Sequence, residues 1–179
     1  MGKQHHKYST PAKPKQEDLR PVELIFARLD ASHQNPTNLL LHYICVPLMV
    51  LGILGMAWAM PFPEIGFLKA YQGYFNWASF VIAVAVYYYL KQSPMLSYLM
   101  LFLMFGFSYL IIQFETWEKA GGPPLGLISV GVLMLSLVGQ YIGGKIEGKE
   151  QSFNDDSKLF YVTPLWVMYR LARKIKLKY

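Results

Sequence analysis

Two histidines and one glutamate flank the long apolar stretches of this sequence, and together they could bind a metal ion. His33 and His42 lie around the start of the first apolar stretch, and Glu147 follows the fourth. Two imidazoles and one carboxylate are the ligand set of non-haem Fe(II) oxygenases. The spacing alone is a weak signal, because a single histidine in an apolar helix more often serves packing or hydrogen bonding. These three residues can share a site only if distant parts of the chain meet in space.

The composition predicts a membrane protein. Of the 179 residues, 54% are hydrophobic and only 16% are charged, and such a chain cannot keep its apolar surface in water. The single cysteine excludes an intramolecular disulfide framework and any multi-cysteine metal site. The net charge of +6 comes from Lys and Arg beside apolar runs, without a nucleic-acid-binding motif. We therefore expect no nucleic-acid partner and interpret the charge as a membrane-orientation signal.

The expected fold is an all-α membrane protein with four transmembrane helices. Each predicted span approaches the roughly 20 residues that cross a bilayer. The expected spans are 39–60, 74–90, 95–114 and 124–143. A disordered basic tail at 1–16 is expected to precede a single helical membrane domain over 17–179.

Two further helices are predicted outside the four spans. Residues 18–31 have apolar side chains at helical spacing on one side only, which is typical of an amphipathic helix on the membrane surface. The apolar stretch 159–172 is too short to cross comfortably and contains Pro164, so we expect a short interfacial or re-entrant helix there.

The positive charges predict the orientation of the spans. Fifteen Lys and Arg residues lie in the terminal regions and in the loop between the second and third spans, and only Lys69 and Lys119 lie in the other two loops. Cytoplasmic segments carry such an excess of positive charge. We therefore expect both termini in the cytosol, in a bacterial plasma membrane or in the endoplasmic reticulum.

The predicted topology brings the candidate site residues together. Asn35 followed by Pro36 is typical of a helix start, and antiparallel spans place the start of the first beside the end of the fourth. If the fourth helix continues past Gly143, residues 140, 144 and 147 share one face. We therefore expect His33, His42, Gln140 and Glu147 to lie close together at the cytosolic surface.

Three segments carry motifs beyond simple hydropathy: SHQNPTNLLLHYICVPL at 32–48, GQYIGGKIEGKEQSF at 139–153 and PLWVMYRL at 164–171. In order and spacing they resemble a small integral-membrane family that includes the fungal 2-hydroxy fatty acid dioxygenase of phytosphingosine α-oxidation. The resemblance covers residues 16–175, with the middle spans matched by hydropathy alone. It implies an Fe(II)-dependent enzyme that uses O₂ to remove one carbon from a 2-hydroxy long-chain fatty acid.

The resemblance also implies that His33, His42 and Glu147 are metal ligands. The family pattern has a further histidine where this chain has Gly144, and glycine has no side chain with which to ligate. Three explanations stay open: the site forms from the three remaining residues and water, the chain binds metal weakly, or the site has been altered by mutation or divergence.

A 2-hydroxy acid can chelate Fe(II) through its carboxylate and hydroxyl groups, which leaves a position for O₂. We expect the acyl chain to lie among the apolar spans. Gln140 is expected to bond a ligating histidine or the substrate carboxylate, and Lys145 to attract that carboxylate. A lysine at the end of a span is also the ordinary positive flank of a membrane helix.

Two alternatives to an enzyme follow from the same residues. Gly144 favours a non-catalytic lipid-binding or structural protein of the same family. A transporter or channel is disfavoured, because the second and third spans carry no acidic, basic or amide group near mid-membrane.

Overall fold

The computed structural model describes residues 20–63, 66, 75–148 and 153–177, and the expected tail at 1–16 lies outside them. In this part of the chain the structure is helical and contains no strand. The helices are α1 (Pro21–Ser32), α2 (Pro36–Ala59), α3 (Trp77–Gln92), α4 (Pro94–Lys119), α5 (Leu125–Glu147) and α6 (Phe153–Lys174).

Local sequence explains where α2 begins and where α5 ends. The Asn35 side chain accepts a hydrogen bond from the backbone N–H of Thr37 at 2.9 Å, and Pro36 occupies the first turn of α2. The predicted start of this helix is therefore confirmed. The α5 helix continues past Gly143 and ends at Gly148, whose φ of 70° is a left-handed conformation that glycine adopts at low cost.

Three helices are long and apolar enough to cross a membrane: α2, α4 and α5. The α3 helix overlaps the second predicted span but contains only 16 residues, about 24 Å at the usual rise. The all-helical class is confirmed, and length and composition support three spans directly.

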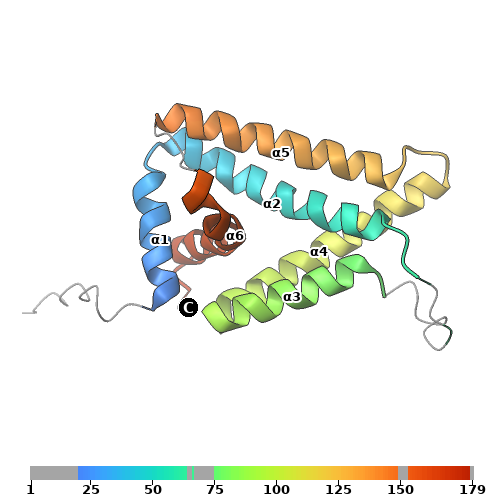
Figure 1. Cartoon of the computed structure of the whole chain (residues 1–179), viewed down its shortest axis with the longest axis horizontal. Helices are drawn as coiled ribbons and strands as arrows, with labels where there is room; N and C mark the ends of the chain where they lie inside the picture. Colours follow the sequence, from blue (N-terminus) through green and yellow to red (C-terminus); the bar gives the residue numbers. More distant parts are fainter. Residues whose placement is uncertain (1–19, 64–65, 67–74, 149–152, 178–179) are drawn as a thin grey trace, which may run out of the picture.

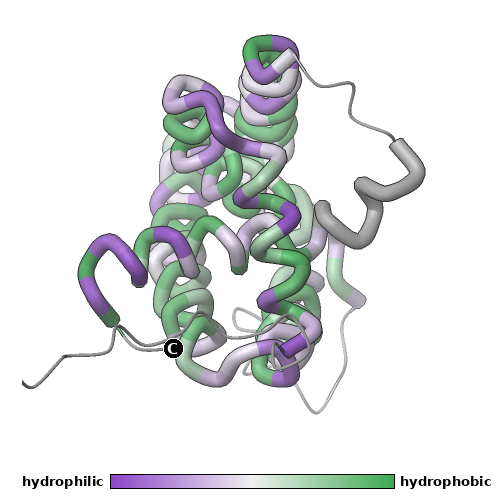
Figure 2. The backbone as a smooth tube through the Cα atoms, turned by 90° about the vertical axis from the view of Figure 1, so that its left-hand side faces the viewer, coloured by the Kyte–Doolittle hydropathy of each residue, from purple (hydrophilic) through white to green (hydrophobic). Residues whose placement is uncertain are grey.

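The helices form two antiparallel pairs that diverge toward one end of the molecule (Figure 1). The α2 and α5 helices make the most extensive contact, and α3 packs along α4. The pairs approach each other near the end of α2 and splay apart where α1 and α6 lie. Figure 2 looks at this splayed end, where hydrophilic and hydrophobic segments alternate.

Small residues allow α2 and α5 to approach closely. A Cβ atom added at Gly52 would lie 2.9 Å from the Cβ of Leu133. One added at Gly139 would collide with the Cys45 sulfur, and one at Gly143 would collide with the Asn38 side chain. Close approach at small residues is how helices associate where water supplies no driving force.

The C-terminal helix is longer and more central than the sequence predicts. The α6 helix has 22 residues, with Pro164 inside it, and it packs against α1, α2 and α4. Val162, Leu165 and Trp166 are fully buried. The apolar stretch 159–172 supplies the buried part, and polar residues on either side extend the helix beyond it.

A partly buried polar cluster fixes α6 against the first two helices. The Arg170 guanidinium lies 2.8 Å from the Asp30 carboxylate and donates to the Tyr43 hydroxyl at 3.1 Å. The Trp166 indole N–H donates to the same Asp30 oxygen at 2.9 Å. Charged hydrogen bonds of this kind hold α6 in one register relative to α1 and α2.

Candidate metal centre

The two candidate histidines face each other at the junction of α1 and α2. His33 follows the last turn of α1, and His42 lies in the second turn of α2. Their side chains are buried, with 6% and 5% of the residue exposed, and the two Nε2 atoms lie 3.2 Å apart. The structure therefore confirms that these residues meet.

A backbone carbonyl oxygen lies beside the Nδ1 atom of each histidine ring. The Nδ1 of His33 lies 2.9 Å from the carbonyl oxygen of Leu29, and the Nδ1 of His42 lies 3.1 Å from that of Asn38. The Ser32 hydroxyl lies 2.9 Å from the same Nδ1 of His33 and 3.1 Å from the Leu29 carbonyl oxygen. Because a carbonyl oxygen only accepts, the two carbonyl contacts favour the hydrogen at Nδ1 in both rings, and in that state each neutral ring presents a lone pair at Nε2.

Two lone pairs at 3.2 Å repel each other unless a cation or a shared proton lies between them. Burial lowers the pKa of His33 below its ordinary value, which disfavours a shared proton. With metal–nitrogen bonds of about 2.1 Å, the observed 3.2 Å separation of the Nε2 atoms corresponds to a ligand–metal–ligand angle of about 100°. The arrangement thus fits two neighbouring ligands of one metal ion, each oriented by a carbonyl.

Trp166 closes the apolar side of the histidine pair. Its ring centroid lies 5.0 Å from that of His33 and 6.3 Å from that of His42, and the residue is 0% exposed. Trp166 lies in the segment PLWVMYRL, and the sequence patterns predict no role for it. A signal was present, since Trp166 and Arg170 stand four residues apart and therefore share one helix face.

Glu147 joins the same region through the start of α2. Its carboxylate accepts hydrogen bonds from the backbone N–H groups of Gln34 (2.7 Å) and Asn35 (3.0 Å) and from the Asn38 side-chain amide (2.9 Å). Asn38 thus bonds Glu147 with its side chain and His42 with its carbonyl oxygen. The start of α2 and the end of α5 meet as predicted, and the Glu147 oxygens hold the helix N-terminus.

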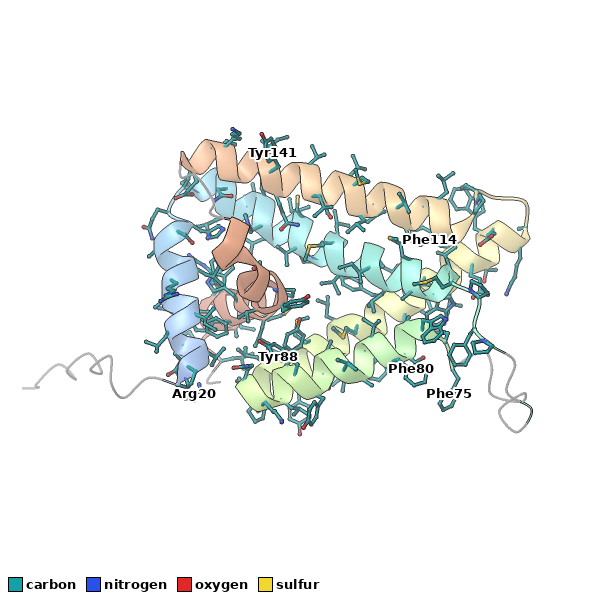
Figure 3. The ribbon with its side chains drawn as sticks, viewed as in Figure 1. Arg20, Phe75, Phe80, Tyr88, Phe114 and Tyr141 are labelled. Carbon is teal, nitrogen blue, oxygen red and sulfur yellow. The ribbon has the colours of Figure 1, made fainter. Side chains whose placement is uncertain are left out.

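The remaining predicted residues lie along α5. The Gln140 amide reaches the Met49 sulfur at 3.5 Å between α5 and α2. Gly144 is helical and half-buried, without a positive φ. Lys145 is exposed, and its ammonium lies 5.5 Å from the ring centroid of Tyr141, which Figure 3 shows on the outer side of α5.

Asn38 is a further residue of this region, and the sequence patterns predict no role for it. It is 1% exposed, and its Oδ1 has no hydrogen-bond partner. An unsatisfied buried oxygen costs free energy. Within the described residues, no group of three His, Cys, Asp or Glu side chains gathers at metal-binding distance.

Comparison of the chain with protein-family models, with curated proteins and with solved structures found no match.

Proposed function

We propose that this chain is a membrane-embedded, Fe(II)-dependent dioxygenase that shortens 2-hydroxy long-chain fatty acids by one carbon. The observation that carries the proposal is the close approach of the buried His33 and His42 side chains, with their Nε2 atoms 3.2 Å apart and a backbone carbonyl beside each Nδ1. With the ring hydrogens at both Nδ1 atoms, the facing lone pairs repel each other until a cation lies between them. The sequence resemblance supplies the choice of iron and of substrate.

The proposed reaction balances with O₂ as the sole oxidant. A 2-hydroxy acid and O₂ give the acid shortened by one carbon, CO₂ and water, so the carbon chain loses the four electrons that O₂ gains. Bound Fe(II) would supply activation of O₂ and chelation of the 2-hydroxy acid.

The residues of the chain have distinct roles in this proposal. His33 and His42 ligate the ion, and the carbonyls of Leu29 and Asn38 favour the ring hydrogens at Nδ1, which leaves both Nε2 atoms available as ligands. Trp166 excludes water from one side of the pair. The sequence predicts Glu147 as a third ligand, and in the described geometry its carboxylate positions the start of α2, which carries His42.

We further propose that α3 is a fourth transmembrane helix and that both termini are cytosolic. The antiparallel packing of α2 and α5 supports this, because it requires an even number of crossings between them. If α4, which is long and apolar enough to cross, spans the membrane, a crossing by α3 keeps that number even. Aromatic residues near both ends of α3 suit the membrane interfaces.

Iron content and product formation test the proposal directly. The purified full chain is loaded anaerobically with Fe(II), washed, analysed for iron and then given a 2-hydroxy long-chain fatty acid and O₂. We expect close to one iron per chain and formation of the shortened acid. His42→Ala should lose both, because it removes one of two imidazole ligands.

The control is a double variant, His5→Ala with His6→Ala, which removes two histidines outside the described residues. Its iron content should match that of the unaltered chain. Melting temperatures are measured for all variants, since losing a buried hydrogen-bonding group alone costs about 1–3 kcal/mol. Equal iron loss in both variants, or no iron in the unaltered chain, would contradict the proposal and favour a lipid-binding protein.

A further inference from the structure

A large apolar groove runs along α3 on the side that faces α2 and α6. Its volume is about 930 Å³. It lies between the C-terminal part of α2 and α3, with α1 and α6 at one end, and Figure 3 shows Tyr88 on the side of α3 that faces α6. The groove does not include the histidine pair.

The chemistry of the walls excludes water as the main occupant. Most of the lining side chains are aliphatic or aromatic, including Ala57, Val81 and Val84. The Trp77 indole N–H donates to the carbonyl of Pro61, and the Tyr89 hydroxyl donates to the carbonyl of Tyr161. A buried water needs two to four polar partners, so a space of this size with these walls suits a hydrocarbon.

The shape of the groove suits a single extended chain. Its lining residues on α3 recur every three or four positions from Trp77 to Tyr89, which is one straight face of the helix. At the usual helical rise this face is about 18 Å long. It ends at Met60 and Trp77 on one side and at Tyr88 and Tyr161 on the other.

The tyrosine end of the groove approaches the candidate metal centre. Val162, in the lining, precedes Trp166 by one turn of α6. Ile25, also in the lining, precedes Leu29 by one turn of α1, and the Leu29 carbonyl bonds His33. Along each helix, the lining residue and the residue that contacts His33 are therefore about 6 Å apart. This end of the groove thus lies one helical turn from the surroundings of His33.

We propose that the groove binds the acyl chain of one long-chain fatty acid, with the carboxyl end toward Tyr88 and the methyl end toward Trp77. The direction of the chain rests on the proposed function, since it brings the carboxyl end toward the histidines. The occupancy of the groove rests only on its shape and its apolar walls.

Photocrosslinking tests occupancy and direction separately. The full chain in phosphatidylcholine nanodiscs is labelled with two palmitic acid analogues, one with a diazirine near the carboxyl group and one with a diazirine at the methyl end. EDTA is present throughout, so the result does not depend on metal binding. We expect the methyl-end probe to label the Met60 and Trp77 region and the carboxyl-end probe to label the Tyr88 and Tyr161 region.

Two variants of α3 provide a matched pair. Ala85→Trp fills the groove, whereas Ala83→Trp makes the same change on an exposed position that is not part of the lining. Saturation of labelling should require about tenfold more probe for Ala85→Trp, as expected for overpacking a binding site, and should be unchanged for Ala83→Trp. Val84→Trp repeats the test at a lining residue that is 69% exposed and tolerates a large side chain in the fold.

Three outcomes would overturn parts of the proposal. Unchanged labelling in the folded Val84→Trp variant would show that the groove does not bind the fatty acid. The same conclusion would follow if excess phosphatidylcholine displaced the label and excess palmitic acid did not. A reversed labelling pattern of the two probes would overturn the direction alone and leave the occupancy standing.

Discussion

The hydrogens on His33 and His42 decide what this pair can bind. Had either Nδ1 lacked a carbonyl partner, its ring could carry the hydrogen at Nε2 and donate it to the other ring as an ordinary hydrogen bond. The carbonyls of Leu29 and Asn38 favour the hydrogen at Nδ1 in both rings. In that state the two rings cannot hydrogen-bond to each other, and the proposed ion would join them.

Glu147→Gln separates a structural role of the carboxylate from ligation. The amide oxygen can still accept from the backbone of Gln34 and Asn35, so we expect iron content to be unchanged. Replacing a charged acceptor at a helix N-terminus should lower the free energy of unfolding by about 0.5–1 kcal/mol. Iron analysis and thermal unfolding in detergent measure the two effects.

Glu118→Gln is the matched control for this change. Glu118 accepts from the backbone N–H of Leu125 at 2.9 Å and so holds the start of α5 at the other end of the bundle. A similar small loss of stability with normal iron is expected. If Glu147→Gln loses iron and Glu118→Gln does not, Glu147 is a metal ligand, as the sequence predicts.

Gly144→His should raise iron affinity and turnover. Position 144 is helical and lies between Gln140 and Glu147 on the face of α5 that packs against α2. An imidazole there would project toward the start of α2, which carries His42. Replacing a helical glycine also favours the helix by about 0.5–1 kcal/mol, so iron content, product formation and melting temperature should all increase.

Gly144→Ala controls for the helix effect. It should raise the melting temperature without changing iron content, because a methyl group cannot ligate. If the histidine variant folds and binds no more iron than the alanine variant, position 144 does not face the metal.

Sequence spacing predicted the meeting of His33, His42 and Glu147, because antiparallel spans leave few arrangements of their ends. It did not predict the roles of Asn38 and Trp166. The Asn38 carbonyl acts through the backbone, which no side-chain pattern reveals, and the contact of Trp166 depends on how deeply α6 enters the bundle. Both roles depend on how distant segments of the chain pack together.

At the scale of helices, glycines determine the spacing of α2 and α5. Gly139→Ala should destabilise the protein by about 1–3 kcal/mol, because its new methyl group would collide with the Cys45 sulfur. Gly131→Ala, on the same helix, has nothing within 4 Å of its added methyl group and should stabilise by about 0.5–1 kcal/mol. Unfolding in detergent compares the two, and equal shifts would contradict close packing at Gly139.

The position of α6 was the least predictable feature of the fold. Its apolar length excluded a comfortable crossing, which left surface and re-entrant positions equally open. The polar contacts of Asp30 with Arg170 and Trp166 select its position, and they join residues more than a hundred positions apart. Periodicity along one segment carries no information about such a pair.

At the scale of the whole molecule, the antiparallel arrangement links the number of spans to the orientation of every loop. If α2, α4 and α5 crossed the membrane without α3, then α2 and α5 would run in the same direction. Glu147 at the end of α5 instead bonds Gln34 and Asn35 at the start of α2. The proposed crossing by α3 makes this contact compatible with a crossing by α4.

Labelling of single cysteines from outside sealed cells tests this topology. In a Cys45→Ala background, Ala120→Cys should react with a membrane-impermeant maleimide, and Lys91→Cys should react only after the membrane is permeabilised. Both positions are exposed on the protein, so burial does not limit either reaction. A three-span arrangement with a cytosolic N-terminus reverses both results, because the omitted crossing of α3 moves Lys91 outside and Ala120 into the cytosol. The reversed pattern would contradict four spans, and it would place Ala120 on the same side of the membrane as the N-terminus.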